Sequence, residues 1–204
     1  MAPVPGAVAP RLVECAGFSP MSDPVIEIVV ESWEIECCAP PPVVGEQATW
    51  RVLFVPSTDH PFSAEHLWSV VPHDPAPRLH RDGVVAAWGG GHTAAAPPPG
   101  EHRLRGHLSG AAHVFPEDLP PVTGRVRRLR VLSYELAADP GGTYALSPVP
   151  GSVAVRDVDA SPRWFARPAP RVGAPARSGQ RFFAGVPQPG RYETGIVVDL
   201  HVGA

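Results

Sequence analysis

The sequence predicts a mainly β fold: a small antiparallel β-barrel or sandwich with long Pro/Gly-rich loops and at most one short helix. The chain of 204 residues contains 28 Pro and 20 Gly, which interrupt helices and central strands. Val outnumbers Leu by 27 to 12, a bias typical of strands. Hydrophobic residues make up 44% of the chain, enough for a core. About seven or eight short apolar segments alternate with Pro/Gly connectors, as in barrels and sandwiches.

The chain is expected to consist of a flexible extension, residues 1–20, followed by one β-rich domain, residues 21–204. The extension is rich in Ala, Pro and Val without periodicity. Met21 directly precedes the first strand signal, and we hypothesise that it is the true start. Residues 1–20 lack a basic start and a continuous apolar stretch, so they do not resemble a secretory signal. With only 3 Cys in the chain, we expect a cytoplasmic protein with reduced thiols and no membrane contact.

The first two expected strands are residues 25–38 and 47–55. Residues alternate from Val29 onward, which places Trp33 and Ile35 on the apolar face. Pro40, Pro41 and Pro42 end that strand, because proline cannot donate to a ladder. The two strands are expected to pair as a hairpin that nucleates the core, with these side chains inside: Trp33, Ile35, Trp50, Val52 and Phe54.

The remainder of the chain is expected to form short strands and long loops. Residues 56–82 are predicted as a loop with one helical turn that Ser63 caps. Residues 161–192 carry six Arg and no acidic residue, and they are predicted as a long Arg/Pro-rich loop. The mixture of Arg and aromatic residues in this loop fits either a loop that packs on the domain or an anion-binding arm. A bulge near Arg127 and Arg128 is needed to keep their strand in register. The expected strands are 84–88, 102–108, 123–137, 144–146, 153–158 and 194–202.

The adjacent pair Cys37 and Cys38 is the most unusual feature of the sequence. On a strand, neighbouring side chains point to opposite faces, so one thiol is expected to be buried and the other exposed. The favoured interpretation makes Cys37 a small core residue. A metal site and a redox site are the alternatives.

A zinc site would need histidines as further ligands beside the two cysteines. Neutral imidazole is a common zinc ligand. No C-x-x-C occurs, and the spacings match no zinc motif, so zinc is only a possible cofactor. The candidate ligands are Cys37, Cys38, His102, His107 and His113.

A basic strand supplies the candidate surface for an anion or a partner. Its members, Arg125, Arg127, Arg128 and Arg130, could contact phosphates of single-stranded nucleic acid. No exposed aromatic residue interleaves with them for base stacking. The favoured interpretation is therefore cross-strand pairing with Glu34 and Glu36.

No hydrolase or phosphate-loop motif occurs, so the sequence leans away from an enzyme. The leading expectation is a non-enzymatic binding or interaction module with an unknown protein partner. A metal- or thiol-dependent site around Cys37 and Cys38 is the first alternative. Binding of single-stranded nucleic acid through the basic strand is the second.

Two motifs resemble an uncharacterised family of actinobacterial proteins, a domain of unknown function. The first is Trp33-x-Ile35-Glu36-Cys37-Cys38, similar to W-x-[MI]-E-C-C, with a V-G-[DE] turn after it. The second is the stretch of residues 123–129, similar to T-G-x-V-R-R-[IL]. The resemblance covers about residues 21–202, and Ala39 stands where the family pattern has Gly. It implies no activity and assigns no functional residue.

Overall fold

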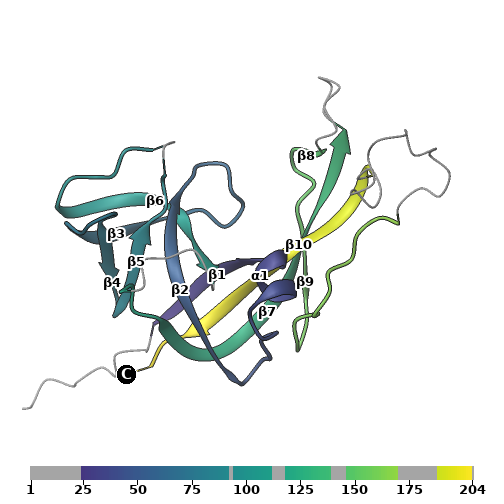
Figure 1. Ribbon diagram of the computed structural model, residues 1–204, viewed down its shortest axis with the longest axis horizontal. Coiled ribbons are helices and arrows are strands. Elements are labelled where there is room, and N and C mark those ends of the chain that lie inside the picture. Colours follow the sequence, from purple (N-terminus) through teal and green to yellow (C-terminus); the bar gives the residue numbers. More distant parts are fainter. Residues whose placement is uncertain (1–23, 92–93, 112–117, 139–145, 170–187, 204) are drawn as a thin grey trace, which may run out of the picture.

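A computed structural model describes residues 24–91, 94–111, 118–138, 146–169 and 188–203 (Figure 1). The fold is mainly β, as expected, with one short helix among the described residues. The expected extension of residues 1–20 lies outside the described residues. The elements are β1 Val25–Glu31, α1 Ser32–Cys37, β2 Gln47–Pro56, β3 Ala64–Val71, β4 Arg78–Arg81, β5 Val84–Trp88, β6 Gly100–Ala111, β7 Val122–Ala138, β8 Leu146–Pro148, β9 Ala154–Asp157 and β10 Gly190–His201.

Strand pairing closes the sheet into two rings that share the β2–β6 pair. One ring runs through β1, β6, β2, β7 and β10, and the other through β6, β3, β4, β5 and β2. The described pairings are antiparallel except β1 with β6 and β2 with β5. In Figure 1 the second ring lies to one side, while β7 and β10 run on beyond it toward β8.

The expected hairpin of residues 25–55 is wrong. β1 pairs with β10 and β6, whereas β2 pairs with β5, β6 and β7. The apolar alternation predicted strands on both sides of the proline run. Alternation does not specify a partner, and here the partners come from distant parts of the chain.

The first strand is also shorter than expected, because residues 32–37 form helix α1. Trp33 and Ile35 share a face in a strand but point in nearly opposite directions in a helix. Ile35 is accordingly fully buried, whereas Trp33 is 47% exposed, so its expected place in the core is wrong. A Cβ on Gly195 would lie 2.2 Å from the Val30 carbonyl oxygen, so the end of β1 depends on a glycine in β10.

Residues 56–82, predicted as a loop with a helical turn, contain the strands β3 and β4. Trp68 and Val70 are buried, while Leu67 and Val71 are exposed, which is a strand alternation. The spacing of Ala64, Leu67 and Trp68 also fits a helical turn, but antiparallel pairing with β6 decides the outcome.

The other predicted strands are confirmed except residues 144–146: β8 begins at Leu146, and residues 144 and 145 lie outside the described part of the chain. The bulge in β7 is also confirmed. Asp199 pairs with Arg128 and Leu200 with Val126, so Arg127 is the extra residue. β10 begins at Gly190, four residues earlier than expected, inside the predicted loop of residues 161–192. Residues 170–187 of that loop lie outside the described part of the chain.

The main core lies inside the rings, and a smaller cluster covers the other face of three strands. Trp50, Val52 and Phe54 of β2 are buried in the main core, as expected. Phe54 packs edge-on against Trp68 with ring centroids 5.5 Å apart. On the other face of β1, β7 and β10, Val29, Leu132 and Val197 pack together.

Two tryptophans with similar sequence surroundings should differ sharply in their effect on stability. Replacing Trp50 by Ala should lower the free energy of unfolding by about 3–5 kcal/mol, because the change empties a core site. Replacing Trp33 by Ala should cost less than about 1 kcal/mol, since the side chain is half-exposed. Urea denaturation of both variants measures the difference. Equal losses would contradict the helical assignment of residues 32–37.

Candidate functional site

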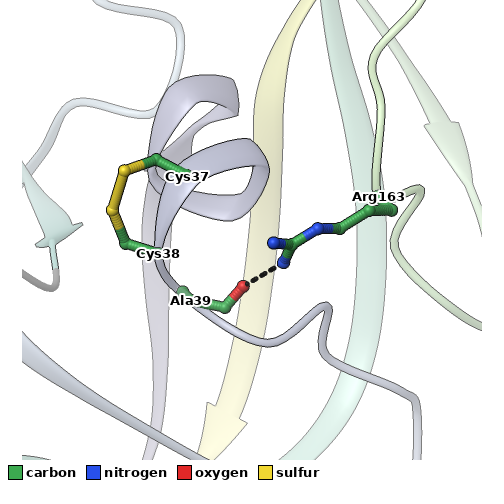
Figure 2. The surroundings of a disulfide bond; sticks show 4 residues. All are labelled: Cys37, Cys38, Ala39 and Arg163. Atoms are coloured by element: carbon green, nitrogen blue, oxygen red, sulfur yellow. Dashed lines mark hydrogen bonds between the residues drawn. A yellow bond between two sulfur atoms is a disulfide. The ribbon is translucent and has the colours of Figure 1, made fainter.

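Cys37 and Cys38 are joined by a disulfide at the end of α1 (Figure 2). Cys37 is exposed and Cys38 is half-buried. The expectation of reduced thiols is therefore wrong for this pair. The expected placement on opposite faces also fails, because the chain here is the end of a helix and not a strand. Figure 2 shows both sulfur atoms on the side of the chain away from Arg163.

The backbone beside the disulfide is held from within the helix and from a distant segment. The amides of Cys38 and Ala39 both donate to the Glu34 carbonyl, at 3.0 and 2.7 Å. The Ala39 carbonyl accepts a 3.0 Å hydrogen bond from the guanidinium of Arg163 (Figure 2). Ala39 itself is buried in the main core. The residue that follows the disulfide therefore links the helix end, the core and the distant segment.

The distant segment is residues 159–167, which docks along α1 and the proline run that follows it. Glu36 accepts a 3.1 Å hydrogen bond from the Phe165 amide and forms a 2.5 Å ion pair with Arg167. Phe165 is 6% exposed and belongs to the main core. The Ser161 amide donates to the Pro42 carbonyl at 2.9 Å. Residues 36–44 thus form the surface on which this segment docks, and we call it the α1 dock. The two cysteines lie within it.

The sequence predicts that Glu36 pairs with the basic strand, and it does not predict the α1 dock. The signal available was weak: residues 161–192 combine Arg with aromatic residues, and the candidate interpretations included a loop that packs on the domain. That interpretation fits residues 161–167. Trp164 is 71% exposed, so only Phe165 of this Trp-Phe pair packs inside.

The histidines predicted as zinc ligands are not gathered around the cysteines in the described part of the chain. His102 and His107 both lie on β6, five positions apart, so the strand sends their side chains to opposite faces. His113 lies outside the described residues. No group of three His, Cys, Asp or Glu able to hold a metal was found among the described residues. A zinc site that uses both cysteines remains a prediction and would require the disulfide to be reduced.

His107 instead stacks on His60, with ring centroids 3.8 Å apart. Burial, and then the neighbouring His60, lower the pKa of His107 to about 4. Burial also lowers the pKa of His60. The Phe62 amide donates to Nδ1 of His60, which that nitrogen can accept only when it carries no proton. The pair is therefore neutral at pH 7.

The basic strand is β7, and its arginines are occupied by partners other than Glu34 and Glu36. Arg125 donates to the Gly45 carbonyl at 2.7 Å, and Arg127 lies 3.3 Å from Nδ1 of His201. Arg128 forms a bidentate pair with Asp157, at 2.6 and 3.1 Å. This hydrogen bonding lowers the pKa of Asp157 and raises that of Arg128.

Arg130 is the buried member of the basic strand. Its guanidinium lies 2.7 Å from Glu27 on β1 and also hydrogen-bonds Asp199 on β10. It therefore links three strands of the first ring. Beside the strand, a hollow of about 250 Å³ is lined by Arg127 and Arg128 together with Asp157 and Asp159, so its charge is mixed. This arrangement fits the favoured interpretation of cross-strand pairing, with different carboxylates from those expected.

The fold defines a mainly β domain whose chemistry-bearing groups are a disulfide of adjacent cysteines and a paired arginine strand. The chain belongs to DUF6578, a family of unknown function, whose family model matches residues 24–202. No curated protein and no solved structure matches the chain. Within the described ranges, no helix is long and apolar enough to cross a bilayer.

Neighbouring arginines of β7 should differ in their contribution to stability. Arg130→Gln should lower the free energy of unfolding by about 1–3 kcal/mol, because it removes a nearly buried guanidinium from the carboxylates of Glu27 and Asp199, which are 38% and 23% exposed. Arg128→Gln breaks an exposed pair and should cost about 0–1 kcal/mol. Urea denaturation at pH 7 measures both, and a costly Arg128→Gln with a harmless Arg130→Gln would contradict the assignment.

His107 should make the domain less stable in acid. The unfolded chain takes up a proton on this histidine near pH 6.5, while the folded chain does so only near pH 4. Stability should therefore fall as the pH drops through that window. His107→Gln should flatten this slope, whereas His80→Gln, at an exposed site, should leave it unchanged. Melting temperatures between pH 7 and pH 4 give the slopes; no change in His107→Gln would be the contrary result.

Proposed function

We propose that the domain carries a thiol–disulfide site at Cys37 and Cys38 whose redox state controls the docking of residues 159–167 on the α1 dock. The observation that carries the proposal is a disulfide between adjacent residues inside the surface that holds that segment. The proposal gives a specific form to the thiol-dependent alternative.

The disulfide contributes little to the stability of the fold through loop closure. A cross-link stabilises a protein mainly by closing a loop in the unfolded chain, and the gain grows with loop length, reaching about 3 kcal/mol for 15 residues. Adjacent cysteines have a sequence separation of 1, so they close the smallest loop available. Its stabilising effect through loop closure is therefore small, which favours a chemical role for the pair.

The position of the pair permits exchange with a dithiol. A thiolate of the dithiol attacks Sγ of Cys37, which is exposed, and Cys38 leaves as the thiolate and takes a proton. The second thiol of the reagent then attacks the mixed disulfide. The reagent ends as a disulfide, and Cys37 and Cys38 end as two thiols, so two electrons and two protons have moved to the protein.

Reduction acts on the dock through Ala39 and Glu36, the two residues that flank the pair. The disulfide fixes the chain between the carboxylate that holds Phe165 and Arg167 and the carbonyl that holds Arg163. With two separate thiols, the side chains of residues 37 and 38 no longer constrain each other, and the Glu34 carbonyl remains as the hydrogen-bond acceptor for the backbone at Cys38 and Ala39. The contacts on either side then lose their fixed spacing, and the affinity of the segment for the dock falls.

The test combines alkylation with proteolysis in a full-length Cys15→Ser chain, in which Cys37 and Cys38 are the remaining cysteines. A dithiol should reduce the folded protein, after which alkylation adds two groups, on Cys37 and Cys38. Trypsin should then cut after Arg163 about tenfold faster, as expected when docking weakens by about 1.4 kcal/mol. Mass spectrometry measures both events, and cleavage after Arg167 does not interfere because Pro168 follows it.

Two variants distinguish the loss of docking from any other effect of the dithiol on cleavage. Cys37→Ser with Cys38→Ser should be cut at the faster rate whether or not the dithiol is present. Glu36→Gln should be cut faster while its disulfide stays intact. The proposal fails if the cysteines become alkylatable only after denaturation, or if reduction leaves the rate of cleavage after Arg163 unchanged.

A further inference from the structure

A pocket of about 50 Å³ is lined mainly by strands of the second ring and by no residue of the α1 dock. Its lining comes from five elements and the loop before β3, and includes Glu27, Phe54, Trp68, Arg81, Gly106 and Leu108. Exposed residues of β3, Ala64 and His66, also line it, so the pocket opens at the protein surface. The sequence missed it because β3 and β4 were predicted as loop.

Three side chains of this pocket, those of Trp68, Arg81 and His107, have buried polar atoms without hydrogen-bond partners in the described part of the chain; in His107 the atom is Nδ1. Trp68 is 1% exposed, and its indole Nε1 has no hydrogen-bond acceptor among the described residues. The same holds for Nε and Nη1 of Arg81. Nε of Arg81 lies 3.3 Å from the carboxylate of Asp82, but without the geometry of a hydrogen bond. Buried polar groups in native proteins nearly always find a partner, so these donors require an explanation.

The unpartnered groups of Trp68 and Arg81 are donors only, which sets the chemistry of what is missing beside them. An indole N–H and a guanidinium cannot accept a hydrogen bond, so their partner must offer acceptors. The guanidinium of Arg81 lies over the Trp68 ring, 4.8 Å from its centroid, so the two groups belong to one cluster. The carboxylate in the lining, Glu27, is already engaged by Arg130.

The nearly buried guanidinium of Arg81 favours an anion as the partner, since Asp82, which pairs with it, is 59% exposed. The Arg81 side chain is only 16% exposed. Burial lowers the pKa of Arg81, and the nearby Asp82 opposes this effect. A guanidinium taken out of water is stabilised by an anion that accepts its hydrogen bonds.

We propose that the pocket binds the anionic oxygen group of a small ligand, a carboxylate or an oxyanion, between Arg81 and Trp68. Arg81 supplies the charge and hydrogen bonds, and the Trp68 indole N–H orients the group. A single buried water needs roughly 10–15 Å³ of such volume, so the pocket has room for one small polyatomic anion. The remainder of a larger ligand extends past His66 to the surface. The site does not depend on the redox state of Cys37 and Cys38.

The experiment measures the melting temperature of the full chain against increasing acetate or inorganic phosphate, with chloride at matched ionic strength as the reference. A ligand that binds only the folded state raises the melting temperature with concentration. We expect a saturable rise with at least one of the two anions. A rise with acetate alone identifies a carboxylate site, and a rise with phosphate alone identifies an oxyanion site.

Three variants locate the effect. Arg81→Gln should weaken the apparent affinity at least tenfold, and Trp68→Phe, which keeps an aromatic ring but removes the N–H, should weaken it severalfold. Arg103→Gln, at an exposed arginine of β6, should bind like the unchanged chain. The inference is overturned if neither anion exceeds chloride, or if Trp68→Phe and Arg81→Gln respond like Arg103→Gln. Should Arg81→Gln fail to fold, Trp68→Phe alone decides.

Discussion

The β2–β6 pair is the constraint on which the arrangement of this domain depends. Because β6 pairs with β1, β2 and β3, it belongs to both rings of strands. The approach is close: a Cβ on Gly106 would lie 2.3 Å from the Val55 carbonyl oxygen, and one on Gly110 would lie 2.9 Å from the Ile28 side chain. Glycine at these positions lets β6 approach β1 and β2 closely, so that side chains of both rings pack into one core. The first ring then carries α1 and its dock, and the second ring supplies most of the lining of the pocket at Arg81.

The two candidate sites use different chemistry and lie on different rings. At the α1 dock, a covalent bond between neighbouring residues sits between two polar contacts that hold a segment more than a hundred positions away in sequence. At the pocket, a guanidinium and an indole share one buried cluster. Family membership gives neither site a function. The α1 dock is inferred from the contacts that hold residues 159–167, and the pocket is inferred from buried donors that have no hydrogen-bond partner among the residues that the structure describes.

Local chemistry in the sequence predicted strands well and their partners poorly. The alternation of Trp50, Val52 and Phe54 and the bulge at Arg127 both follow from period-two patterning, which is a local property. The helix at residues 32–37 was missed because Trp33 and Ile35 fit a strand equally well, and only burial separates them. The disulfide could not be predicted, since a strand would have kept the two sulfur atoms apart. The dock and the pocket arise from contacts between distant segments, which one sequence does not encode locally.

The most direct test of the redox account is hydrogen exchange at the amides of Phe165 and Ala166, compared between the oxidised and the reduced full-length protein. In the oxidised structure these amides donate to Glu36 and Glu193. The account predicts that reduction lowers the protection of Phe165, while amides in the centre of β2 keep theirs. Equal protection of Phe165 in the two states, with Cys37 and Cys38 verified as reduced, would contradict it.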